Sequence, residues 1–147
     1  MPEIKREGKA VWKGGLKDGS GTTTTQSGFL KDLPYSVPSR FENAKGTNPE
    51  ELIAAAHASC FSMMLSKILG DQNKTAQQIA TTATLTMQLS ATGAKITSIH
   101  LVTEASVPGM DAAAFKKAAD EAKEKCPIST LLRPGLESLT LEARLAS

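Results

Sequence analysis

Two cysteines, Cys60 and Cys126, are the residues of this 147-residue chain best suited to redox chemistry. Cys60 stands in the middle of an uncharged segment, AAAHASCFSMML, which covers residues 54–65. Free cysteine is among the most buried residue types and often only packs as a small apolar side chain. A thiol becomes a nucleophile when neighbouring groups stabilise its thiolate. The residue type alone therefore favours packing, and the neighbours decide whether Cys60 does chemistry.

Three other residues of the chain favour a reactive Cys60. Cys126 precedes Pro127, at a helix junction where free backbone N–H groups favour a thiolate and where one thiol could approach another. Arg40 comes just before the charge-poor helix expected around this segment, and a guanidinium lowers the pKa of a thiol in apolar surroundings. Glu50 could orient Arg40 through a bidentate ion pair, although the helix dipole explains a carboxylate at a helix start equally well.

The two histidines do not indicate a metal site. His57 lies one helical turn before Cys60, and we expect it to be a packed or hydrogen-bonded core residue rather than a base. The cysteines and histidines lack the close pair spacings typical of zinc sites, so no metal is expected.

The composition argues against several classes of function. The chain has 17 basic and 15 acidic residues, a formal net charge of +2, and one Trp, one Tyr and four Phe, which is not the pattern of a nucleic-acid-binding face. No run reaches the roughly 18 apolar residues of a membrane span, and the N-terminus lacks the apolar stretch of a signal peptide. We therefore expect a cytoplasmic protein, in which two cysteines are buried or redox-active thiols rather than a structural disulfide.

The pattern of the remaining residues predicts a single α+β domain over residues 1–147. Glycine-broken strands open the chain, and a segment with two prolines at 31–41 is expected to be an edge strand or an ordered loop. The further elements expected are a helix at 49–69, two strands within 81–107 with one shift of face, a helix at 111–125, a short turn begun by Cys126, and a strand at 139–145.

The helix that carries Cys60 has strong local signals. Asn48 is a suitable N-cap, Pro49 suits the first helical position, and Glu51 and Gly70 suit the first turn and the end. Because residues 54–65 carry no charge, this helix cannot keep one face in water and is expected to be buried nearly all round.

Several of these motifs together resemble one protein family. The string RFE followed by KGTNPEELIAAAHASCFSM, within residues 40–63, and a Cys-Pro pair about 65 residues after Cys60 are similar to the OsmC branch of the OsmC/Ohr hydroperoxide reductases. The resemblance extends over essentially the whole chain through SGFL, PYSVPSRFE, VPGMDAAAF and CPIS. It implies antiparallel strands around a long buried central helix, in an intertwined homodimer.

The resemblance also implies an activity. Cys60 would attack organic hydroperoxides, and hydrogen peroxide more weakly, and would form a sulfenic acid that Cys126 resolves as a disulfide. Arg40 and Glu50 would organise the site, and an external dithiol, for which the family suggests dihydrolipoyl groups, would reduce the disulfide. Such an antioxidant enzyme of the stress response needs no metal, haem or flavin. Candidates for an apolar mouth are Leu52, Phe61, Met63 and Met64.

Helix geometry adds a constraint on Glu50. Ten residues separate Glu50 from Cys60, and at 1.5 Å per residue their backbones lie about 15 Å apart. Glu50 therefore does not easily reach the thiol of its own chain. Two antiparallel copies of the helix across a two-fold axis would bring the Arg40 and Glu50 of one chain to the Cys60 of the other, in shared active sites.

Two other functions are compatible with the same residues. The cysteines could belong to a peroxide or thiol sensor without turnover, or they could merely pack in a structural stress protein. Pairing of two thiols with Arg40 argues against both, because packing does not require it. The preferred peroxide and the physiological reductant stay open.

Overall fold

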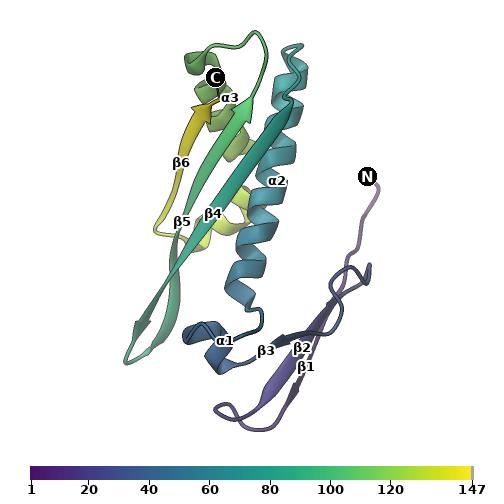
Figure 1. The fold of residues 1–147 in the computed structure, drawn as a ribbon, viewed down its shortest axis with the longest axis vertical. Helices are drawn as coiled ribbons and strands as arrows, with labels where there is room; N and C mark the ends of the chain where they lie inside the picture. The colour runs from purple at the N-terminus through teal and green to yellow at the C-terminus, as the bar shows by residue number, and fades with distance from the viewer. Residues whose placement is uncertain (147) are drawn as a thin grey trace. The chain divides into compact units, whose positions relative to one another are not determined.

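The computed structural model describes residues 1–146 and has the expected α+β architecture, with two three-stranded sheets and one long helix (Figure 1). Contacts along the chain divide it into two compact units, Met1–Leu52 and the remainder from Ile53. The assignment of residues 1–147 to one domain stays a prediction.

The first unit contains an antiparallel sheet of β1 (Gly8–Lys13), β2 (Ser20–Thr25) and β3 (Leu33–Tyr35), in that spatial order. Trp12 pairs with Gly21, and Gly21 with Tyr35, across the three strands. A Cβ atom on Gly21 would lie 2.6 Å from the Tyr35 ring, so only glycine admits this ring at that position. The Trp12 and Tyr35 ring centroids lie 5.5 Å apart, so the two side chains form an aromatic pair across the sheet.

A short helix, α1 (Val37–Phe41), follows β3 where the sequence suggested only an edge strand or a loop. The Ser36 side chain accepts from the backbone N–H of Ser39, and the Ser39 side chain accepts from the N–H of Ser36. This reciprocal capping, together with Pro38 in the first turn, starts a helix despite the prolines. Arg40 lies in the last turn of α1.

The long helix α2 (Pro49–Asp71) begins where it was predicted and ends two residues later than expected. The Asn48 side chain accepts from the N–H of Glu51 at 2.8 Å and caps the helix. Within one chain the helix is not covered on all sides, because one stripe stays exposed: Ala55, Ala56, Ser59 and Met63. By length and composition α2 could cross a membrane, but the core helix of a soluble protein passes the same test.

The second unit contains a sheet of β4 (Gln78–Ser90), β5 (Gly93–Ser106) and β6 (Ser138–Leu145), in that order. The β4–β5 hairpin is antiparallel, and its register shifts between Thr86 and Met87, which confirms the predicted change of face. The β5–β6 pair is parallel, whereas antiparallel strands were expected. A parallel neighbour requires a crossover, which α3 (Ala112–Lys125), α4 (Pro127–Leu132) and the 3-10 turn Arg133–Gly135 supply.

One face of this second sheet forms the core. Figure 1 shows α2 and α3 on the same side of the sheet. The buried residues alternate along β5, and the helices contribute their apolar faces to the same cluster: Phe61, Leu65, Ile68, Leu69, Ile99, Leu101, Ala105, Phe115, Ala118, Ala119, Ala122 and Cys126. The two elements that carry cysteines, α2 and the junction of α3 with α4, therefore share one core.

Candidate active site

The structure brings the two thiols of the chain together. Cys60 is half-buried on α2, and Cys126 is fully buried at the junction between α3 and α4. The sulfurs are close enough for the Cys126 side chain to affect the pKa of Cys60 directly. Neither cysteine is in a disulfide. The predicted proximity of a second thiol to Cys60 is thus present within a single chain.

The sequence Cys-Pro explains the position of Cys126. Its N–H still donates to the Ala122 carbonyl and ends α3, while its extended backbone (φ −60°, ψ 121°) turns the chain into α4. Proline disfavours a helical conformation at the residue before it and is well suited to the first position of the next helix. Cys126 therefore begins the short helix, as expected. Because Pro127 has no N–H, Ile128 provides the first free backbone donor of α4.

That donor reaches the other cysteine. The backbone N–H of Ile128 forms a hydrogen bond to the Cys60 sulfur, which lowers the pKa of the Cys60 thiol. Burial has the larger effect and raises this pKa above the ordinary value of 9.0, and the neighbouring Cys126 raises it further. A single chain thus holds Cys60 mainly as a thiol at neutral pH. A nearby positive charge is needed to make the thiolate abundant.

Arg40 and Glu50 form a second pair, within the first unit. The Nε and Nη2 atoms of Arg40 both donate to Oε1 of Glu50, at 2.9 and 2.6 Å. The predicted pairing is present, but it uses one carboxylate oxygen rather than two. Oε2 of Glu50 is buried and has no hydrogen-bond partner among residues 1–146. The Arg40 side chain is 40% exposed, so its guanidinium is held in place and still accessible.

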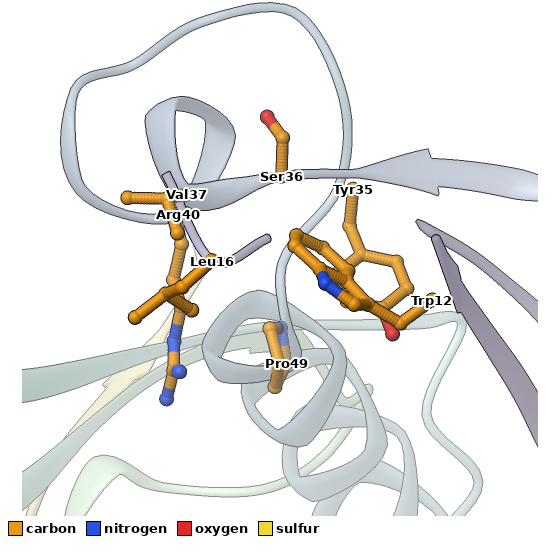
Figure 2. Close-up of a pocket in the computed structure, with 7 residues that line it drawn as sticks. All are labelled: Trp12, Leu16, Tyr35, Ser36, Val37, Arg40 and Pro49. Atoms are coloured by element: carbon orange, nitrogen blue, oxygen red, sulfur yellow. The ribbon is translucent and has the colours of Figure 1, made fainter. Parts of the chain in front are cut away.

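An open, mainly apolar hollow of about 280 Å³ lies beside Arg40 in the same unit. Figure 2 shows the Trp12 and Tyr35 rings on one side of it and Leu16 and Arg40 on the other, with Pro49 between them. Sequence reasoning missed the aromatic members, although they are the only Trp and the only Tyr of the chain.

Of the four residues expected to line an apolar mouth, the structure excludes one. Phe61 is completely buried in the core of the second unit and cannot line an opening, so its assignment was wrong. Met63 is 75% exposed, and Met64 packs against the core while remaining partly accessible.

His57 is a hydrogen-bonded core histidine, as expected. It is completely buried, and its Nε2 atom lies 2.7 Å from Oγ of Ser129. Burial lowers the pKa of His57 below 6.5, which keeps the ring neutral. Sequence reasoning missed Ser129 as its partner, because 72 residues separate the two.

The comparison with known proteins agrees with these motifs. The model of the OsmC-like protein family matches residues 42–138, which include both cysteines. The chain belongs to the OsmC-like protein family. It is 46% identical to peroxiredoxin OsmC of Escherichia coli K12 over 98% of this chain and 99% of the relative. It is 30% identical to an organic hydroperoxide resistance protein of Xanthomonas axonopodis pv. citri over 75% of this chain and 78% of that protein.

A solved structure has the same fold. The organic hydroperoxide resistance protein OhrB of Bacillus subtilis superposes with a TM-score of 0.69 and 25% identity, covering 95% of this chain and 98% of that one. Membership of the OsmC-like family thus rests on sequence and on three-dimensional structure.

Proposed function

We propose that this OsmC-like chain is a thiol-dependent peroxidase that reduces organic hydroperoxides and, more weakly, hydrogen peroxide. The observation that carries the proposal is the adjacency of Cys60 and Cys126 within one chain. The relatives named peroxiredoxin and organic hydroperoxide resistance protein support it. We place the activity in the cytoplasm, where external thiols are available as reductants.

The reaction has three steps. The Cys60 thiolate attacks the terminal oxygen of ROOH, the O–O bond breaks, and the alkoxide takes a proton and leaves as ROH. Cys60 is then a sulfenic acid. The sulfur of Cys126 displaces the hydroxyl, an S–S bond forms as the S–O bond breaks, and the hydroxyl leaves with the Cys126 proton as water. An external dithiol, such as a dihydrolipoyl group, reduces the Cys60–Cys126 disulfide by two exchange steps and is itself oxidised.

Each protein group has a defined part in this cycle. The Ile128 N–H supports negative charge on the Cys60 sulfur. Arg40, fixed by Glu50, supplies the positive charge that burial of Cys60 makes necessary. The aromatic hollow beside Arg40 would hold the organic group of ROOH, which accounts for a preference over hydrogen peroxide.

The proposed enzyme is a homodimer with shared sites. Glu50 and Cys60 are ten residues apart on one helix, about 15 Å along its axis, so a second copy is better placed to supply Arg40 and Glu50. The exposed stripe of α2, from Ala55 to Met63, consists of small or flexible uncharged residues on which a second α2 could pack closely.

The decisive assay follows consumption of cumene hydroperoxide and hydrogen peroxide with dihydrolipoamide as donor. Wild type should turn over, Cys60→Ser should be inactive, and Cys126→Ser should react once and then stop or over-oxidise. Mass spectrometry of the oxidised wild type should find Cys60 joined to Cys126 within one chain. A single stoichiometric oxidation without turnover would indicate a sensor, and an unreactive Cys60 would indicate that the cysteines only pack.

A further inference from the structure

The buried pair His57 and Ser129 takes no part in the chemistry described so far. His57 Nε2 and Ser129 Oγ lie 2.7 Å apart, and both residues are completely buried. The other ring nitrogen, Nδ1, is buried without a hydrogen-bond partner. Since Nδ1 has no partner among the described residues, the single hydrogen bond of this pair only partly offsets the free energy of burying its polar groups.

The hydrogen bond between His57 and Ser129 lies close to both cysteines along the chain. His57 precedes Cys60 by three residues on α2, and residues three apart on a helix lie on the same side. Ser129 follows Cys126 by three residues, in the first turn of α4. The hydrogen bond therefore joins the two elements one turn away from each sulfur.

Packing alone does not explain this choice of residues. Apolar side chains at both positions 57 and 129 would fill the same space and leave no buried polar group unpaired. A hydrogen bond differs from an apolar contact in being directional, since it weakens steeply when its angle or length changes. The hydrogen bond can therefore fix the rotation of α4 about its axis and its position along α2. An apolar contact between such a short helix and α2 would define both less well.

We propose that His57 and Ser129 are positioning residues for the resolving step of the peroxidase cycle. The proposal rests on the function proposed above. The hydrogen bond holds α4 so that the Cys126 sulfur stays beside Cys60, and so that the Ile128 N–H stays on the Cys60 sulfur. In the step affected, Cys126 attacks the Cys60 sulfenic acid, S–S forms, S–O breaks and water leaves with the Cys126 proton. Neither His57 nor Ser129 exchanges a proton or electron in it.

The test separates attack from resolution in a single turnover with one equivalent of cumene hydroperoxide. His57→Leu and Ser129→Ala should form the disulfide at least about tenfold more slowly than wild type, because small displacements of reacting groups cost rate steeply. Dimedone trapping should show a longer-lived sulfenic acid on Cys60, and excess peroxide should produce more sulfinic acid there. His57→Gln, whose amide can still reach Ser129, should recover most of the wild-type rate.

Ser62→Ala is the matched control. Ser62 is also on α2 and donates a part-buried hydrogen bond, at 2.8 Å, but to Thr81 on β4. Its loss should lower the melting temperature without changing the ratio of disulfide to sulfinic acid. If folded His57→Leu and Ser129→Ala resolve at the wild-type rate, or if Ser62→Ala slows resolution equally, the positioning role is wrong. Should His57→Leu fail to fold, the smaller change Ser129→Ala decides.

Diamide oxidation separates failure of this proposal from failure of the proposed function. Diamide joins two neighbouring thiols without any peroxide reaction. If wild type does not consume peroxide, slower diamide-driven Cys60–Cys126 bond formation in Ser129→Ala than in Ser62→Ala would still support positioning, and equal rates would overturn it.

Discussion

Ile128, two residues after Cys126, donates a hydrogen bond from its backbone N–H to the sulfur of Cys60. The same helix start therefore supports negative charge on one thiol and carries the other. The Cys-Pro sequence produces both features, because Pro127 begins α4 and leaves Ile128 as its first free donor. The Ile128 N–H and the Cys126 thiol have opposite effects, since the first lowers the pKa of Cys60 and the second raises it.

Removal of the second thiol should make the first more acidic. In Cys126→Ala the effect of Cys126 on Cys60 is lost while the Ile128 hydrogen bond and the burial remain, so the pKa of Cys60 should fall. The pH dependence of Cys60 alkylation by iodoacetamide should shift to lower pH relative to wild type. An unchanged or higher midpoint would mean that the Ile128 contact depends on Cys126.

Replacement of Arg40 should slow peroxide attack without unfolding the protein. Arg40→Met should reduce the rate with cumene hydroperoxide at least about tenfold, equivalent to about 1.4 kcal/mol of activation free energy, because in the proposed shared site the burial of Cys60 would then go uncompensated. Arg40→Lys should be intermediate, since it keeps the charge but loses the planar fork held by Glu50. Stopped-flow kinetics and thermal melting would measure both effects.

Arg144→Met is a suitable control for Arg40. Arg144 forms an ion pair with Glu142 at 2.7 Å, with both side chains about half exposed, and it lies outside the proposed site. Its replacement should leave the rate unchanged. If Arg40→Met reacts at the wild-type rate, or does not fold, then Arg40 is a structural ion-pair residue and another group stabilises the thiolate.

Acid should destabilise the protein through His57. Burial lowers the folded-state pKa of this histidine below 6.5, so the unfolded chain takes up the proton at a higher pH than the folded chain. The contribution to the free energy of unfolding is intact above about pH 6.5 and decreases as the pH falls from there toward the folded-state pKa. The melting temperature of wild type should fall more between pH 7 and pH 5 than that of His57→Gln. Parallel pH profiles would contradict a buried neutral His57.

A charge on the exposed stripe of α2 should weaken the proposed dimer. Ala56→Glu would bury unpaired carboxylates in the interface and should raise the dimer dissociation constant at least about tenfold. Ala113→Glu adds the same charge to an exposed position of α3 and should leave the dimer intact. Sedimentation velocity at micromolar concentration would compare them. A monomeric wild type, or equal effects of both changes, would contradict the interface.

The parts of the structure that depend on local chemistry could be predicted from the sequence. The Asn48 cap, the shift of face in the second hairpin and the role of Cys126 at a helix start all follow from residues within one or two turns. The α1 helix is local too, but its prolines argued for a strand or loop, and the Ser36–Ser39 capping box that starts the helix was overlooked.

The other features that were missed depend on residues far apart in the sequence. The parallel pairing of β6 with β5 is decided by the path of the crossover, and alternation of apolar residues in β6 does not reveal direction. Ser129 meets His57 only after the crossover has folded, and Trp12 and Tyr35 meet only across a sheet. Cys60 and Arg40 could be chosen as candidates because their residue types have specific chemistry, whereas a backbone donor such as Ile128 has no signature of its own.

Cys126 lies in the long crossover between β5 and β6, 66 residues after Cys60, although the two sulfurs are neighbours. A covalent bond between them would close a large loop and restrict the unfolded chain, which chain-entropy arguments value at about 4 kcal/mol for a loop of this length. In the proposed cycle, each peroxide consumed would therefore leave the protein harder to unfold until a dithiol reopens the loop. Resistance to heat or protease would then report how much of the protein is oxidised.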